Sequence, residues 1–262
     1  MISQRSGITA FFIVTAVVVL AAALAPRVPQ PQSYHQFADQ RGWLGIPNFG
    51  DVASNLPFAA VGIWGLWFVW SKRGRRQFLD KRERWPYAVG FFGLFLTAFG
   101  SSCYHLAPDN ARLVWDRLPM TLVFMPLVAA IIVERISVNA GLWLLPVLSA
   151  IGAASVWQWY ASELRNEGDL RMYAAVQVYA LVILLVALLL PPRYTRSNDL
   201  LWVVGFYSLA KILETGDRQV FALTGRTVSG HTLKHLAAAM AGYWVLHMLQ
   251  KRRPIFTSRF AS

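Results

Sequence analysis

Long apolar blocks separated by short polar stretches dominate this chain. The first block covers residues 8–25, and seven more follow at about 49–70, 87–105, 118–137, 140–159, 170–190, 200–213 and 231–249. Most contain about 18 to 22 residues, which is the length that a helix needs to cross ~30 Å of hydrocarbon. The pattern therefore predicts an all-α integral membrane protein with a seven-transmembrane helix bundle over 48–250 and one extra N-terminal transmembrane helix.

The N-terminal block, residues 1–25, allows two interpretations. Ala23, Leu24 and Ala25 fit a small-residue cleavage site, so the block resembles a signal peptide. Its apolar core of about 18 residues is longer than the usual 7 to 15, which favours an uncleaved transmembrane helix or signal anchor. Both interpretations place the polar segment 26–47 outside the cytoplasm. The block at 200–213 is short because charged residues interrupt it, and it can be extended to about Leu223.

The composition supports a membrane protein, and the positions of the charged residues explain its positive net charge. Hydrophobic residues make up 56% of the chain and charged residues only 15%, against about 25% in soluble domains. The net charge of +12 comes from short loops between apolar blocks, with no nucleic-acid motif, so no nucleic-acid partner is expected. Basic loops stay in the cytoplasm, which predicts a cytoplasmic C-terminal tail over 251–262. The main basic positions are Lys72, Arg73, Arg75, Arg76, Lys81, Arg82 and Arg84 in one loop, and Lys251, Arg252, Arg253 and Arg259 in the tail.

Polar groups inside a span are costly, so they mark candidate functional sites. Ser101 and His105 share one helix face at the end of block 87–105, and His231 and His235 share one face at the start of the last block. The orientation set by the basic loops puts both of these ends in the outer leaflet. Three histidines with a fourth position left for water are a typical ligand set of catalytic zinc. We therefore predict a zinc site there.

Asp116 follows His105 by eleven residues and returns to the same outer face. A carboxylate within one water of a zinc ion can act as a general base. A structural interpretation stays open, because an acid just before a helix that starts at Leu118, with Pro119 nearby and Arg117 to neutralise it, is a common cap. The single cysteine, Cys103, excludes an internal disulfide, and its position on the helix predicts packing rather than metal ligation.

Together these residues resemble the alkaline ceramidase family, which belongs to the CREST superfamily of seven-transmembrane zinc hydrolases. Ser101 with His105, Asp116 with Leu-Pro-Met just after it, and His231 with His235 carry the resemblance. The segment 48–55, NFGDVASN, is similar to the polar opening of that family's first helix. The resemblance covers about residues 45–250, and the additional N-terminal helix is typical of a bacterial branch, which predicts an inner-membrane location.

The resemblance implies that His105, His231 and His235 hold zinc. It further implies that Asp116 takes a proton from the attacking water and that Ser101 stabilises the oxyanion; the neighbouring Ser102 faces away from His105. The family also carries a calcium site with a glutamate at its first helix. Here Asn48 stands at that position, which makes calcium doubtful; the remaining candidate ligands are Asp39, Asp51 and Asn55.

These features predict a zinc-dependent membrane hydrolase that takes ceramide or a ceramide-like N-acyl lipid from the bilayer and cleaves its amide to a fatty acid and an amine. The alternatives are a receptor-like lipid-binding protein with structural zinc and a zinc transporter, whose ligands would lie near the midplane. The oligomeric state stays open. Glu214, Asp217 and Arg218 are expected to form an internal ion pair beside the cavity. His35 is expected in a loop, and His247 at the inner membrane interface.

Overall fold

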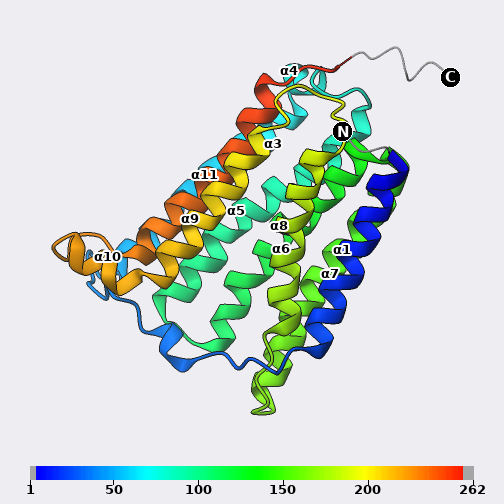
Figure 1. Ribbon diagram of the computed structural model, residues 1–262. Helices are drawn as coiled ribbons and strands as arrows, with labels where there is room; N and C mark the ends of the chain where they lie inside the picture. The colour runs from blue at the N-terminus through cyan, green and yellow to red at the C-terminus, as the bar shows by residue number, and fades with distance from the viewer. Residues whose placement is uncertain (1–3, 256–262) are drawn as a thin grey trace.

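The computed structural model describes residues 4–255, and in this range the chain forms long helices that run side by side, with no β-strand (Figure 1). Short helices connect the long ones at both ends. The elements are α1 (Gln4–Leu24), η1 (Gln32–His35), α2 (Phe49–Ala53), α3 (Leu56–Trp70), α4 (Lys72–Arg75), η2 (Lys81–Glu83), α5 (Arg84–Leu106), α6 (Asn110–Arg135), α7 (Val138–Leu164), α8 (Arg171–Leu189), α9 (Asp199–Thr215), α10 (Asp217–Leu223) and α11 (Gly230–Lys251).

Six helical regions among the described residues are long and apolar enough to cross a membrane. They include the six predicted blocks up to residue 190, so the membrane class and the all-α fold are confirmed for them. The last two predicted spans, α9 and α11, are helical but fall outside this set. Helix α9 has 17 residues, and α11 carries three histidines and Lys234. Length and hydropathy therefore establish six candidate spans rather than eight.

Two predicted helix boundaries are wrong in ways that matter for the site. Helix α6 begins at Asn110 rather than Leu118, so Asp116 lies within the helix and not before it. The Asp109 side chain caps α6 instead, accepting a hydrogen bond from the Arg112 amide at 2.7 Å. The predicted extension of block 200–213 is interrupted at Gly216, after which the short helix α10 begins.

Small residues bring the central helix α5 close to its neighbours. A Cβ placed on Gly100 of α5 would lie 1.9 Å from the carbonyl oxygen of Trp115 on α6, so only glycine permits this backbone approach. Gly62 of α3 plays the same part against α5, because its Cβ would lie 2.6 Å from the Phe95 amide. In a membrane, lipid tails are as apolar as the helix surfaces, so helices associate through close packing at small residues such as glycine. The contact at Gly100 places the next residue, Ser101, against α6.

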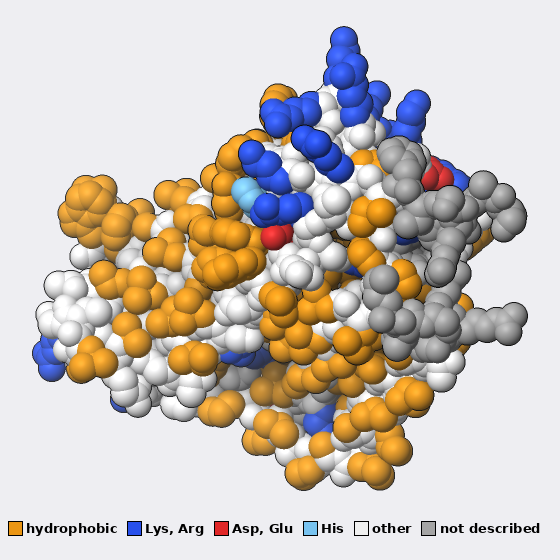
Figure 2. All heavy atoms as spheres, turned by 45° about the horizontal axis from the view of Figure 1, so that its top comes forward, with side chains coloured by type: hydrophobic (Ala, Val, Ile, Leu, Met, Phe, Trp, Pro, Cys, Tyr) orange, Lys and Arg blue, Asp and Glu red, His pale blue; other side chains and the backbone are white. Residues whose placement is uncertain are grey.

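The basic loops gather at one end of the bundle, which Figure 2 shows as a concentration of Lys and Arg side chains. This end holds α4, the start of α5 and the end of α11. Arg252 belongs to the predicted basic tail but is buried, paired with Glu134 and stacked on the Tyr194 ring at 3.9 Å. Arg252 is therefore part of the buried core at this end of the bundle and does not add to the surface charge. Arg259 lies outside the described residues.

Helix α1 lies at the edge of the bundle against α8 (Figure 1). Its hydroxyl-bearing Thr15 is 3.0 Å from the Tyr179 hydroxyl, and Gly7 packs directly on Leu190. Most of α1 is exposed outside the bundle, while the buried Phe11 joins the main core. From its end the chain runs along residues 26–47 across the end of the bundle opposite the basic loops. We call these residues the covering segment.

We predict that Gly100→Ala destabilises the protein, because the added methyl group must push α5 and α6 apart. Overpacking of this kind costs about 1–3 kcal/mol or more, which a lower thermal unfolding midpoint in detergent will report. Gly90→Ala on the same helix is the matched control: its Cβ would meet no atom within 4 Å, and alanine favours helix by ~1 kcal/mol. Equal stability of the two variants would contradict the proposed contact.

Candidate metal centre

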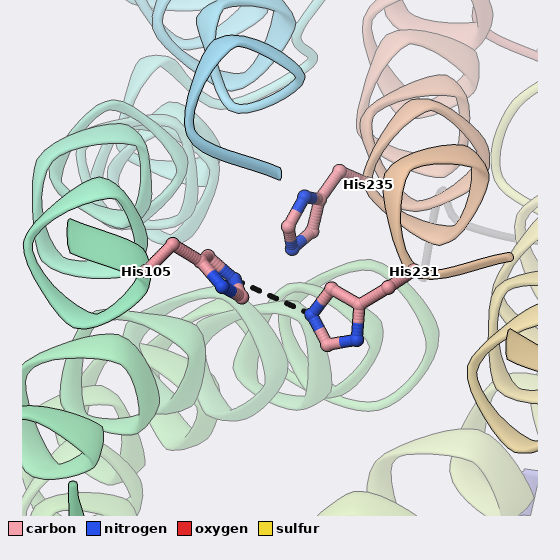
Figure 3. Close-up of side chains that lie close together, drawn as sticks. All are labelled: His105, His231 and His235. Carbon is pink, nitrogen blue, oxygen red and sulfur yellow. Dashed lines mark hydrogen bonds between the residues drawn. The ribbon is translucent and has the colours of Figure 1, made fainter. Parts of the chain in front are cut away.

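Three histidine side chains meet at the end of the bundle opposite the basic loops. His105 comes from the last turn of α5, while His231 and His235 occupy successive turns at the start of α11 (Figure 3). All three are buried, and each offers a ring nitrogen within 4.8 Å of the others. The ring centroids are separated by 4.8, 4.9 and 5.1 Å. We call this group the histidine cluster, and its assembly confirms the predicted convergence of the two helices.

The geometry of the histidine cluster fits a tetrahedral metal ion. Bonds of about 2.0–2.1 Å from zinc to nitrogen separate two ligand nitrogens by about 3.3–3.4 Å. The Nε2 atoms of His105 and His231 are 3.3 Å apart. His105 also has no hydrogen-bond partner at its buried Nδ1, so neither of its ring nitrogens contacts an oxygen acceptor. A cation between the rings would bind the Nε2 atoms of His105 and His231, which otherwise face only each other.

Ser54 determines which nitrogen of His235 is available. Its hydroxyl lies 3.1 Å from the Asp51 carbonyl oxygen, which can only accept, so the hydroxyl proton points there. The 2.8 Å contact between Ser54 Oγ and His235 Nδ1 must then be donated by the imidazole. The lone pair of His235 is therefore on Nε2. A partner that fixes the tautomer of a histidine in this way is a common feature of metal sites.

Polar side chains of α2 and of the turn before α11 hold the ligand-bearing helix ends in register. The Asp51 carboxylate accepts hydrogen bonds from Thr232 at 2.8 Å and Ser229 at 3.3 Å. Asn48 donates to the His105 carbonyl oxygen at 2.8 Å. Asp217 accepts from the His231 amide at 2.8 Å. Because the contacts of Asp51 and Asn48 join segments far apart in sequence, the histidine cluster is assembled by tertiary hydrogen bonds.

The covering segment shields the histidine cluster. Phe37 is buried and its ring lies 4.6 Å from the His105 ring and 4.5 Å from the His231 ring. His35, predicted as a loop residue, lies in η1 and contacts the Tyr104 hydroxyl at 2.9 Å. Tyr34 donates to Glu214 at 2.9 Å, and burial raises the pKa of this phenol, so the proton stays in place. The segment thus excludes bulk water from one side.

Asp116 and Ser101 lie together beside the histidine cluster. Both are buried and line the same cavity, with Ser101 near enough to Asp116 to stabilise its carboxylate. The interpretation of Asp116 as a cap is wrong, because the residue lies inside α6. Arg117, which was expected to neutralise Asp116, also stacks its guanidinium on the Trp159 ring, 4.1 Å from the ring centroid. The two predicted catalytic residues are therefore brought together, on the surface of one cavity.

That cavity has a volume of about 380 Å³ and runs through the middle of the bundle. His235, Ser101 and Asp116 line one end of it. The rest of the wall is mainly apolar and comes from α5, α6, α8, α9 and α11, with Leu94, Leu127, Leu184, Val203 and Val245 among the lining residues. An apolar cavity with a few polar groups at one end is a typical binding site for an amphipathic ligand.

The predicted ion pair among Glu214, Asp217 and Arg218 does not form; Glu214 and Asp217 have other partners. Glu214 lines the cavity and pairs with Lys211 and, at 2.7 Å, with Lys234. Asp217 instead accepts backbone hydrogen bonds from Ala38 and His231, each at 2.8 Å. Arg218 is exposed and forms none of the ion pairs in the part of the chain that the structure describes. The cations that pair with Glu214 in the cavity wall are therefore Lys211 and Lys234.

The calcium candidates do not form a cluster of acids. The Arg41 guanidinium binds both oxygens of Asp39, at 2.8 and 2.7 Å, and these hydrogen bonds lower the pKa of the Asp39 carboxyl. Asp51 binds Thr232 and Ser229, and Asn55 donates to the Asp51 carbonyl oxygen at 2.8 Å. Within residues 4–255, the histidine cluster is the only group of three potential metal-ligating side chains.

The neighbouring residues of α5 face elsewhere. Ser102 contacts the Val52 carbonyl oxygen at 3.4 Å and takes no part in the cavity wall. Cys103 points away from the histidine cluster, as predicted, but it is exposed rather than packed between helices. His247 lies at the basic end of α11, 5.3 Å from the Trp244 ring. Neither Ser54 nor Phe37 was predicted to contact the histidines; Ser54 lies in the polar segment 48–55, whereas nothing in the sequence marks Phe37.

We predict that Ser54→Ala weakens binding of added Zn²⁺ by about 10- to 100-fold, because His235 loses the partner that fixes its tautomer. Competition with a chromophoric zinc chelator will measure this affinity. Ser102→Ala is the matched control, since the Ser102 hydroxyl contacts only a distant backbone carbonyl. An unchanged affinity in Ser54→Ala would show that the serine does not orient a ligand.

Comparison with known proteins adds no family to this geometry. No protein-family model matches the chain, and no curated protein matches it.

Proposed function

We propose that this chain is a membrane hydrolase that holds zinc on His105, His231 and His235 and cleaves the amide bond of ceramide or a ceramide-like N-acyl lipid. The observation that carries the proposal is the meeting of three features: the buried histidine cluster, the adjacent pair of Asp116 and Ser101, and an apolar cavity that begins beside them. The resemblance to alkaline ceramidases in these same residues supports it.

The proposal includes seven spanning helices, namely α2 with α3 as one span, then α5, α6, α7, α8, α9 and α11, with α1 as an additional span. Helix α11 contains too many polar residues to be recognised by hydropathy, but its polar His231, His235 and Lys234 face the interior of the bundle and the cavity, not lipid. The basic loops at the opposite end favour a cytoplasmic location for that end. The histidine cluster then lies in the outer leaflet of a bacterial inner membrane.

Zinc bound at the histidine cluster would supply a Lewis acid and a water of lowered pKa. Asp116 is placed to accept the proton of the attacking water and to return it to the leaving amine nitrogen. Ser101 is placed to donate a hydrogen bond to the oxygen on which negative charge develops. Phe37 keeps bulk water from the other side of the histidines, so these electrostatic contacts act in a dry environment.

The shape and chemistry of the cavity support an acyl lipid as substrate. The polar end holds the reacting groups together with Lys234 and Glu214, which can bind hydroxyl or amide groups of the head. The apolar wall of the cavity can hold the hydrocarbon chain of the lipid out of water, with the chain starting beside Asp116. A lipid-binding protein with structural zinc would use the same cavity but would not need the Asp116 and Ser101 pair. A zinc transporter would need ligands near the midplane, where this cavity is lined by apolar residues.

We expect purified protein to contain about one zinc per chain and to release fatty acid from N-acyl sphingoid lipids. Asp116→Asn should retain the zinc and lose about 10²- to 10⁴-fold in rate, the usual contribution of a general base. His231→Ala should lose both the metal and the activity. Mass spectrometry of lipids after incubation, together with elemental analysis of the protein, will measure the two quantities.

Asp109→Asn is the matched control, because asparagine also caps a helix well and Asp109 does not line the cavity. It should keep near-normal activity. Stoichiometric zinc without turnover of any amide or ester lipid would overturn the hydrolase proposal and leave the lipid-binding alternative. Uptake of radioactive zinc into proteoliposomes would favour a transporter.

A further inference from the structure

The cavity follows one stripe of α5 from the reacting groups toward the basic end of the bundle. Its lining on this helix repeats every three or four residues, which is the spacing of a single helix face: Ser101, Thr97, Leu94, Gly90 and Tyr87. The rise of fourteen residue steps from Tyr87 to Ser101 corresponds to about 21 Å along the helix axis. The cavity is therefore long and has a defined polar start.

The far end of the cavity is closed by a buried polar network. Tyr87 lines the cavity and donates a hydrogen bond to Glu134 at 2.7 Å. Glu134 is paired with Arg252, and the Arg252 guanidinium stacks between the rings of Tyr194 at 3.9 Å and Phe78 at 4.8 Å. Breaking a buried pair of this kind is costly, so the closing residue Tyr87 is held firmly. An apolar chain in the cavity would stop there.

One helical turn from Tyr87 toward the polar end, the cavity wall has no side chain, because the residue there is Gly90. Gly90 lines the cavity, and a Cβ built on it would meet no atom within 4 Å. Other glycines of α5 are needed for helix contacts, as at Gly93 and Gly100, where a Cβ would collide with α6. Gly90 makes no such contact. Its absence of a side chain leaves the last part of the cavity open.

We infer that the cavity is a chain-length-limited site for one unbranched acyl chain, with Tyr87 as the end stop and Gly90 as the residue that sets how far the chain reaches. The inference rests on the proposed function, because it assumes that the scissile amide lies beside Ser101 and Asp116. An extended chain advances ~1.2 Å per bond, a third of the ~3.6 Å per residue of extended backbone. The depth of about 21 Å then holds about 17 bonds, and the level of Gly90 corresponds to about 14.

Displacement of a fluorescent fatty acid by lauric and palmitic acids tests the inference without requiring turnover. Wild-type protein should bind both acids. Gly90→Leu fills the open region and should weaken palmitic acid by at least about tenfold relative to lauric acid, with Gly90→Ala intermediate. The same order is expected for hydrolysis of N-lauroyl and N-palmitoyl sphingoid lipids.

Gly205→Leu is the matched control: a Cβ at Gly205 also meets no atom within 4 Å, but the residue is exposed on α9 and does not line the cavity. It should leave the chain-length profile unchanged. A wild-type profile in Gly90→Leu, with an unchanged unfolding midpoint, would overturn the inference, as would absence of fatty-acid binding in the wild type. A profile shifted by Gly90→Leu without any amide hydrolysis by the wild type would overturn the proposed function while the acyl site stands.

Discussion

The cost of burying polar groups in a helical bundle governs both ends of this molecule. At the basic end, the buried carboxylate of Glu134 is paired with Arg252 and hydrogen-bonded to Tyr87, so the charge is offset within the protein. At the other end, the Nε2 atoms of His105 and His231 face each other at 3.3 Å. Two imidazole nitrogens that face each other in a buried site are well placed to share a metal ion.

The two ends are connected by close helix packing. Glycines of α3 and α5 let backbones approach without intervening side chains, as at Gly62 and Gly100. The second of these contacts places Ser101 against α6, which carries Asp116, so the relative position of these two residues depends on a glycine that has no functional group of its own. The interior space that remains forms one cavity from the histidine cluster toward Tyr87. A single cavity with one polar end suits a ligand that has a polar head and one apolar chain.

Residue types and spacing were sufficient to predict the three histidines that meet in the structure, but not the residues that contact them. The i, i+4 pairs of Ser101 with His105 and of His231 with His235 locate four residues of the candidate site on two helix faces, and the structure brings those faces together. The role of Asp116 as a cap was wrong because propensity does not locate a helix start well: Asp109 offers an equally good cap one residue before α6. The partners of Glu214 could not be predicted, since Lys234 lies twenty residues away on another helix.

The sequence by itself determined the helical membrane class and the histidines of the candidate metal site, because apolar length and polar groups within apolar blocks are local signals. Tertiary structure decided how those residues are oriented. The tautomer of His235 depends on Ser54, the shielding of the histidine cluster depends on Phe37, and the free space at the level of Gly90 in the cavity depends on the missing side chain there. Each of these contacts joins segments distant along the chain or depends on what a position lacks, and neither property can be read from residue periodicity.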